Sequence, residues 1–336
     1  MAGKTRIAVA GAGLIGRAHI AALRASPTCE LAGVVDPSPA AGADFSSIEE
    51  LLEKDRPHGV VLATPNQLHV PQALQCIEAG LPVLVEKPLA SAVAEGEKLV
   101  QARGKVLVGH HRAHSPIMAK AKQVVDSGAL GRLVAVMGSA TFYKPEQYFA
   151  EGPWRKAPGG GPILINMIHE VHNLRMLCGE IVAVQAIASS AVRGFAVEDT
   201  AAISLQFANG ALGSFMLSDT AACARSWEQT ARENKSYASY DDEDCYVIAG
   251  TDGSLSVPTM RLKTYPRPEE RSWSKPFRLG KIELAREDPI ARQMEHFGAV
   301  VRGEAEPLVS ATDGLANLRV TEAIARAAAT GAAVRI

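Results

Sequence analysis

The chain has 336 residues, of which 47% are hydrophobic and 21% charged, and its formal net charge is −1. This length predicts two domains, and the balanced charge argues against nucleic acid or a membrane surface as a partner. The N-terminus does not resemble a signal peptide, and the 5 scattered cysteines contain no Cys-x-x-Cys pair. We therefore expect a cytoplasmic protein with reduced thiols.

The first elements carry the pattern of a dinucleotide-binding turn. An apolar strand over residues 6–10 and a helix reaching about residue 26 flank the turn Gly11-Ala12-Gly13-Leu14-Ile15-Gly16. The glycines of such a turn allow a sharp bend, close approach to a pyrophosphate and tight helix–strand packing, and the helix N-terminus faces the phosphates. A second strand over residues 31–35 ends in Asp36, the acidic residue that binds ribose hydroxyls in this pattern. Since no cation neighbours Asp36 to bind a 2′-phosphate, we predict NAD rather than NADP as cofactor.

Alternating strands and helices continue to residue 109 and predict a doubly wound parallel sheet. We expect strands over 59–63, 81–85 and 106–109, and helices over 47–54, 67–79 and 93–102. Thr64-Pro65-Asn66, with His69 in the helix that follows, is expected beneath the nicotinamide ribose, and Glu86-Lys87-Pro88 follows the next strand. A lysine at the carboxyl end of a buried strand lies where open α/β sheets bind their ligands, although a solvated Glu–Lys pair is the alternative.

Three histidines behind the last of these strands, His110, His111 and His114, raise the question of a metal site. A zinc site needs three or four converging ligands, and no carboxylate at a suitable spacing accompanies these side chains. We therefore predict no bound metal and interpret the group as the lining of an active site.

A different pattern begins at residue 133 and predicts a mainly antiparallel second domain. The long β-type runs cover residues 133–142, 182–191, 200–207 and 211–217. Between the first two runs, a helix over 163–178 carries Asn166, His169 and His172 at spacings of three, which places them on one broad face. Polar side chains on an apolar helix need a polar cavity or one another as partners, and histidine suits proton transfer near neutral pH. The alternative is that these histidines are structural.

The rest of the second domain is predicted from turn and charge patterns. The dipeptide Asn209-Gly210 indicates a tight hairpin turn between two of the long runs. Residues 220–245 contain the acidic run 241–244 and are predicted to form an exposed loop, because charge runs usually face solvent. We expect a hairpin over 246–257, helices over 289–302 and 310–329, and a final strand over 333–336.

Taken together, the motifs resemble the glucose–fructose oxidoreductase / inositol dehydrogenase / MocA family. They occur in that family's order over nearly the whole chain: the glycine turn, Thr64-Pro65-Asn66, Glu86-Lys87-Pro88, Gly109-His110, Trp154-Arg155, and Gly159-Gly160-Gly161 followed by His169. The resemblance implies an N-terminal Rossmann domain over 1–120 and a C-terminal α+β domain over 121–336 with a large, mainly antiparallel open sheet. It also implies that this sheet forms homodimers or homotetramers, and that the C-terminal helix can pack back on the first domain.

The resemblance further implies hydride transfer between the nicotinamide of NAD and a hydroxyl or ketone of a sugar, cyclitol or related polyol. Lys87 would polarise the reacting oxygen, His169 would act as general acid and base, and Glu86 would belong to the cofactor site. The candidates for positioning the substrate are Asn166, His172, His110 and Arg155. Ile165 and His172 stand where the family commonly has aspartates, so this chain departs from the family at the substrate side of the site.

Three other functions stay open on the same scaffold. An NAD-dependent glycosidase would oxidise and re-reduce a sugar within one turnover while it retains its cofactor. An aromatic cis-dihydrodiol dehydrogenase would use the same hydride chemistry on a different substrate. A non-catalytic NAD-binding sensor would need neither Lys87 nor His169, and the presence of both argues against it.

Overall fold

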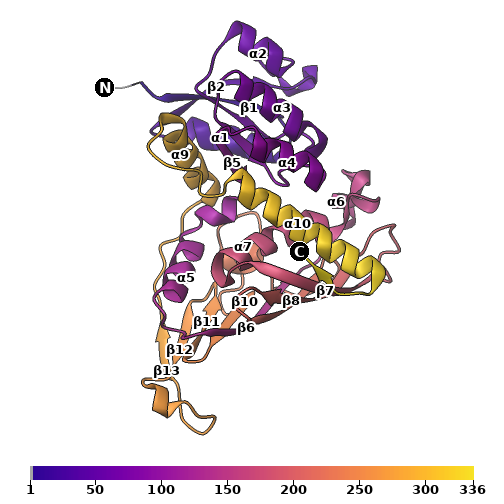
Figure 1. The fold of residues 1–336 in the computed structure, drawn as a ribbon. Helices are drawn as coiled ribbons and strands as arrows, with labels where there is room; N and C mark the ends of the chain where they lie inside the picture. The colour runs from indigo at the N-terminus through magenta and orange to yellow at the C-terminus, as the bar shows by residue number, and fades with distance from the viewer. Residues whose placement is uncertain (1–2) are drawn as a thin grey trace. The chain divides into compact units, whose positions relative to one another are not determined.

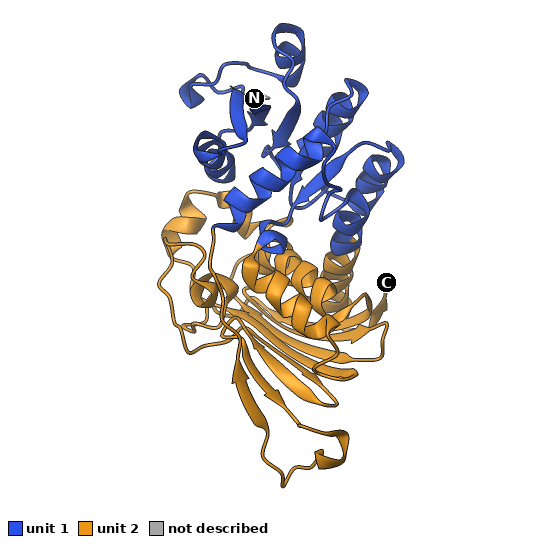
Figure 2. Cartoon of the chain, turned by 90° about the vertical axis from the view of Figure 1, so that its left-hand side faces the viewer, with its two compact units in different colours: residues 1–114, 288–318 blue, residues 115–287, 319–336 orange. Residues whose placement is uncertain are grey.

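The computed structural model describes residues 3–336, and the chain divides into two compact units (Figure 2). The first unit contains the chain up to His114 together with Asp288–Leu318, and the second contains Ser115–Glu287 and Arg319–Ile336. Among the described residues, no helix is long and apolar enough to cross a membrane.

These units differ from the predicted division at residues 120 and 121, which included a C-terminal helix that packs back on the first domain. The first unit ends earlier, at His114, and a segment near the C-terminus returns to it. Its helix α9 (Pro289–Arg302) places Met294 and Phe297, both fully buried, in the apolar core of the first unit. The apolar face of this helix is therefore the physical reason why the unit is not contiguous in sequence.

The first unit is built on a parallel sheet of β1 (Thr5–Ala10), β2 (Cys29–Val35), β3 (Gly59–Leu62), β4 (Val83–Glu86) and β5 (Val106–Gly109). The strand order is β2-β1-β3-β4-β5, and every neighbouring pair is parallel. All residues of β3, β4 and β5 are buried, which explains why these strands are continuous apolar runs in the sequence. The strand order reverses between β1 and β3, and ligands of such sheets bind outside the carboxyl ends of the strands at that point.

Helices lie on both faces of this sheet, as a doubly wound fold requires (Figure 1). The connecting helices are α1 (Leu14–Ala25), α2 (Ile48–Lys54), α3 (Asn66–Glu78) and α4 (Val93–Gln101). Helix α1 packs beside α9, while α3 packs beside α2 and α4. The predicted α/β architecture of this unit is confirmed.

The second unit contains a sheet of nine strands in the order β13-β12-β11-β10-β6-β9-β8-β7-β14. The strands are β6 (Leu133–Thr141), β7 (Ile181–Ser189), β8 (Thr200–Phe207), β9 (Leu212–Ser218), β10 (Tyr246–Gly250), β11 (Gly253–Val257), β12 (Arg261–Thr264), β13 (Arg278–Lys281) and β14 (Val334–Arg335). Every pair is antiparallel except β6 with β9. The predicted mainly antiparallel sheet and its final strand, which pairs with β7, are confirmed.

One face of this sheet is covered by helices and the other is open. Helices α5 (Pro116–Asp126) and α7 (Ile168–Cys178) and the second half of α10 (Ala311–Thr330) bury their apolar side chains in the core against the sheet (Figure 1). Buried and exposed residues alternate along β8 and β9, as expected when only one face is covered. The open face carries the exposed apolar side chains of Met137, Ile187, Leu212 and Met216.

The prediction that residues 220–245 form an exposed loop is wrong in part. The segment contains the short helix α8 (Trp227–Ala231), in which Trp227 is almost completely buried. Within the acidic run, Asp244 is buried as well, and its carboxylate accepts hydrogen bonds from the Thr259 amide at 3.0 Å and from Arg261. Asp244 can be buried because these two donors pair with its carboxylate, whereas Asp241 pairs with Arg232 at the surface and stays exposed.

Candidate active site

In the glycine turn between β1 and α1, Gly11 and Gly16 have no room for a side chain, whereas Gly13 has free space beside it. Gly11 has a φ of +92°, and a Cβ added there would lie 2.4 Å from the carbonyl oxygen of Ala63. A Cβ on Gly16 would lie 1.8 Å from the carbonyl oxygen of Gly11, whereas a Cβ on Gly13 would meet no protein atom within 4 Å. Helix α1 begins at Leu14 without a side-chain cap, so its first amide groups suit a pyrophosphate that approaches over Gly13.

The carboxylate of Asp36, at the end of β2, is oriented by two backbone amides. Its Oδ2 accepts a hydrogen bond from the Ala12 amide at 2.8 Å, and its Oδ1 accepts one from the Ser38 amide at 2.9 Å. The first bond ties the carboxylate directly to the glycine turn. Each carboxylate oxygen has a second lone pair, which suits the hydroxyls of a ribose and repels a phosphate at the same place.

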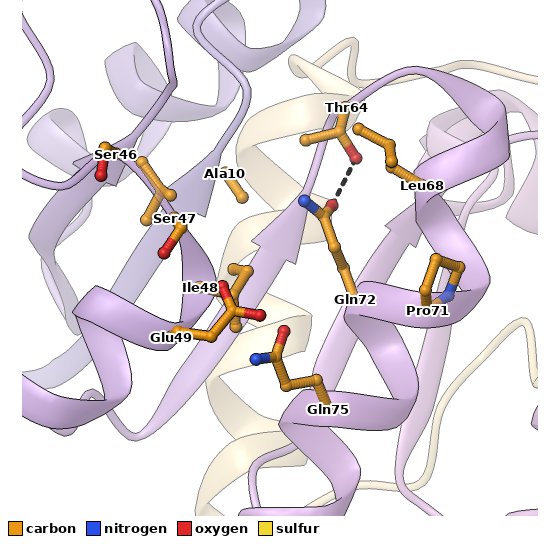
Figure 3. Close-up of a pocket in the computed structure, with 11 residues that line it drawn as sticks. Ala10, Ser46, Ser47, Ile48, Glu49, Thr64, Leu68, Pro71, Gln72 and Gln75 are labelled. Carbon is orange, nitrogen blue, oxygen red and sulfur yellow. Dashed lines mark hydrogen bonds between the residues drawn. The ribbon is translucent and has the colours of Figure 1, made fainter.

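A cavity of about 400 Å³ lies beside this turn, between the start of α2 and helix α3 (Figure 3). The ends of β1 and β2 close it at Ala10 and Val35, and the side chains of Gln72 and Gln75 point into it from α3. Its complete lining is Ala10, Val35, Ser46, Ser47, Ile48, Glu49, Thr64, Leu68, Pro71, Gln72 and Gln75. This lining mixes apolar side chains with hydrogen-bonding ones, which suits the adenosine end of a dinucleotide, and sequence reasoning missed this cavity.

The Thr64-Pro65-Asn66 loop is held in place by contacts with the side chains of Gln72 and His69. The Thr64 hydroxyl donates to Gln72 Oε1 at 2.7 Å, and His69 is 1% exposed. The His69 ring nitrogens lie 2.8 Å from the carbonyl oxygen of Pro88 and 2.9 Å from that of Thr64. Burial lowers the pKa of His69 despite these two acceptors, so the neutral ring donates to one carbonyl at a time. The imidazole thus braces the loops after β3 and β4, while its contact with the cofactor stays a prediction.

Glu86 and Lys87 stand at the carboxyl end of β4, as predicted. Glu86 is 5% exposed, Lys87 is half-buried, and the Lys87–Pro88 peptide bond is cis. Burial lowers the pKa of the Lys87 amine, the Glu86 carboxylate opposes this effect, and the cation of Arg112 adds to it. The Lys87 amine therefore holds its proton less tightly than a surface lysine does.

In the second unit, a π turn over Ile163–Met167 precedes α7 and changes the predicted helix geometry. His169 and His172 lie in α7 and are buried at 8% and 7% exposure. Asn166 lies in the π turn, so the step of 100° per residue used in the prediction does not apply to it. Its Oδ1 accepts a hydrogen bond from Nζ of Lys144 at 2.7 Å.

Lys144 belongs to a buried charge cluster that the sequence did not reveal. Its Nζ lies 3.5 Å from Oδ2 of Asp219, and Oδ1 of the same carboxylate accepts a bond from Arg193 Nε at 2.9 Å. Glu198 accepts the amide hydrogen bond of Ile163 at 2.8 Å at the start of the π turn, and burial raises the pKa of its carboxyl. Charged residues just beyond the ends of β6 and β9 were the only signal of this cluster in the sequence.

The last two predicted positioning residues belong to different units. His110 lies in the first unit, 1% exposed, with its Nε2 3.1 Å from Nδ2 of Asn317 in α10. Arg155 lies in the second unit, where its guanidinium stacks on the ring of Tyr148 at 3.8 Å from the centroid. Among residues 3–336, no three or more His, Cys, Asp or Glu side chains form a group that could hold a metal ion.

An open glycine turn, an anchored carboxylate and a nucleotide-sized cavity at the switch point of a parallel sheet define a dinucleotide-binding Rossmann unit. Comparison with known families agrees: residues 5–108 match the oxidoreductase family with an NAD-binding Rossmann fold, and residues 118–256 match the GFO/IDH/MocA C-terminal domain. The chain therefore belongs to the Gfo/Idh/MocA family of oxidoreductases. The family, fold class and NAD cofactor expected from the motifs are confirmed.

Curated relatives are distant but extend over most of the chain. A 1,5-anhydro-D-fructose reductase of Ensifer adhaerens is 27% identical over 311 residues, which covers 88% of this chain and 84% of the relative. An inositol 2-dehydrogenase of Rubrobacter xylanophilus is 27% identical over 345 residues, with 98% and 87% covered. The WlbA dehydrogenase of Bordetella pertussis, crystallised with NADH and UDP-GlcNAcA, aligns over 99% of both chains with a TM-score of 0.78 and 23% identity. That structure supports the fold.

Proposed function

We propose that the protein is an NAD-dependent dehydrogenase that acts on a secondary alcohol or ketone of a sugar, cyclitol or related polyol. The observation that carries the proposal is the position of the half-buried Lys87 at the carboxyl end of β4, in the unit that carries the NAD-binding turn. The names of the reductase and inositol dehydrogenase relatives support a sugar or cyclitol as substrate.

The proposed chemistry assigns one task to each of two side chains. NAD, when bound, supplies the acceptor for the hydride. In the oxidation direction, His169 takes the proton of the reacting hydroxyl, and Lys87 stabilises the developing alkoxide by a charge-assisted hydrogen bond. Asn166, His172, His110 and Arg155 remain the candidates for positioning the substrate.

The test is a panel of sugars, cyclitols, sugar acids and aromatic dihydrodiols, scored by NADH absorbance. We expect Lys87→Ala and His169→Ala each to lower kcat by about 10²–10⁴-fold, while the NADH dissociation constant stays within about twofold of wild type. Lys98→Ala is the matched control, because Lys98 is an exposed lysine of the same unit. Turnover of Lys87→Ala close to that of wild type on the best substrate would contradict the proposal.

The same panel separates the alternative functions. Turnover of a glycoside without added NAD, by protein that retains cofactor through purification, would favour the glycosidase. Activity confined to dihydrodiols would favour the dihydrodiol dehydrogenase. NAD binding without turnover of any compound would favour the sensor.

We also propose that the open face of the second-unit sheet joins copies of the chain into a homodimer or homotetramer. Met137, Ile187, Leu212 and Met216 give this face an exposed apolar surface, which a second copy would cover. Light scattering after size-exclusion chromatography should show an oligomer for wild type and a monomer for Met216→Lys. Val192→Lys, which changes an exposed apolar residue in a turn outside the sheet, should leave the oligomer intact.

A further inference from the structure

A buried hydrogen bond connects the cofactor-binding helix to the residue that precedes Lys87. His19 lies on α1 three residues after Gly16 and is fully buried. Its Nε2 is 2.8 Å from Oε1 of Glu86, whose side chain is 6% exposed. A carboxylate buried so deeply needs donors, and His19 supplies one to this oxygen. The other oxygen, Oε2, accepts the backbone amide of Lys87 at 3.1 Å.

The neighbouring strand leaves room for this carboxylate. Glu86 at the end of β4 is paired in register with Gly109 at the end of β5. A Cβ on Gly109 would lie 2.7 Å from Oε1 of Glu86 and 2.9 Å from its Cα. Three elements therefore accommodate the Glu86 carboxylate next to Lys87: α1 supplies a hydrogen-bond donor, β4 carries Glu86, and β5 leaves space for it at Gly109.

The charge of Glu86 is also set by this arrangement. Burial alone would raise the pKa of Glu86, but the hydrogen bond from His19, together with the charges of Lys87 and His111, brings it below its usual value. Glu86 is thus ionised at neutral pH and opposes the lowering of the Lys87 pKa by burial and by Arg112. Removal of the His19 donor favours a protonated Glu86, and Lys87 then loses the nearby negative charge.

We propose that His19 is a positioning residue that holds the Glu86 carboxylate and, through it, the Lys87 ammonium. The catalytic importance of this contact rests on the role proposed for Lys87 above, whereas the contact itself does not. His19 needs only its Nε2 hydrogen for this task, because Nδ1, within the described part of the chain, is buried without a hydrogen-bond partner. A side chain of similar reach with one amide donor should therefore replace it.

The test compares His19→Leu, which removes the donor, with His19→Gln, which keeps one. The first readout is the titration of Lys87 in the full-length protein without substrate, followed by NMR of ¹³C-methylated lysines and assigned with Lys87→Arg. The second is the alkaline limb of the pH profile of kcat/KM. We expect His19→Leu to move both to lower pH by about one unit, and His19→Gln to leave both near wild type.

A double-variant comparison identifies the path of the effect. Glu86→Gln should reproduce the shift of His19→Leu, and adding His19→Leu to Glu86→Gln should produce no further shift of the Lys87 titration. An unchanged Lys87 titration in His19→Leu, with lower thermal stability alone, would overturn the inference. Normal turnover of Lys87→Ala would instead overturn the proposed function, and a shifted Lys87 titration would still support the contact.

Discussion

Gly13 and Gly16 lie only three residues apart, yet substitution by alanine should affect protein stability very differently at the two positions. In Gly13→Ala the new methyl meets no protein atom within 4 Å, and the φ of −69° at this helix N-cap is accessible to alanine. The stability change should therefore stay below about 1 kcal/mol. In Gly16→Ala the methyl would lie 1.8 Å from the carbonyl oxygen of Gly11, so the backbone must shift. We expect the free energy of unfolding to fall by about 1–3 kcal/mol, which lowers Tm by about 2–4 °C for each kcal/mol.

The binding of NADH, in contrast, should be affected more by Gly13→Ala than by Gly16→Ala. The methyl of Gly13→Ala occupies the approach to the pyrophosphate, so the NADH dissociation constant should rise about tenfold or more, which corresponds to about 1.4 kcal/mol. Thermal unfolding without cofactor and a fluorescence titration with NADH measure the two effects separately. Gly280→Ala in β13, where the new methyl would meet only Leu262 at 3.8 Å or more, should change neither. Wild-type NADH affinity in Gly13→Ala, or an unchanged Tm in Gly16→Ala, would refute the reasoning.

Three further predictions concern other parts of the chain. Asp36→Ala should weaken the binding of NAD more than the binding of NADP. An unchanged ratio of the two dissociation constants would contradict the predicted preference for NAD. In the native protein, only Cys223 should react quickly with a thiol reagent, because the other cysteines are buried and two of them have a thiol pKa raised to about 12. Tyr246→Phe removes a buried hydroxyl that donates to Glu170 and should lower the free energy of unfolding by about 1–3 kcal/mol, measured by denaturant titration.

The fold was predictable where a local pattern reflects burial. Strands β3, β4 and β5 are buried on both faces and are therefore continuous apolar runs that sequence inspection finds. Strands β12 and β13 were missed, because each is only 4 residues long and none of their residues is buried. The π turn over Ile163–Met167 was missed for a different reason: a helical periodicity gives no sign of one extra residue per turn.

The candidate site was predictable where its chemistry is local in sequence. The glycine turn, Asp36 and Lys87 each follow directly after a strand, and strand ends are where such sheets bind ligands. Contacts between distant residues were not predictable, such as that of His19 with Glu86, which are 67 positions apart. The same holds for Lys144 and Asn166, since neither residue type nor spacing identifies a partner 22 positions away.

The return of residues 288–318 to the first unit has a consequence for biosynthesis. Ribosomes add about 5–20 residues per second, so the 173 residues of Ser115–Glu287 separate the two parts of this unit by roughly 9–35 s. During that interval the nascent Rossmann unit lacks α9, and the surface that Met294 and Phe297 later cover stays exposed. A gene fragment that ends at residue 114 would encode this unfinished state. The NAD-binding unit is therefore completed only after translation has passed through strands β6 to β13 of the second unit.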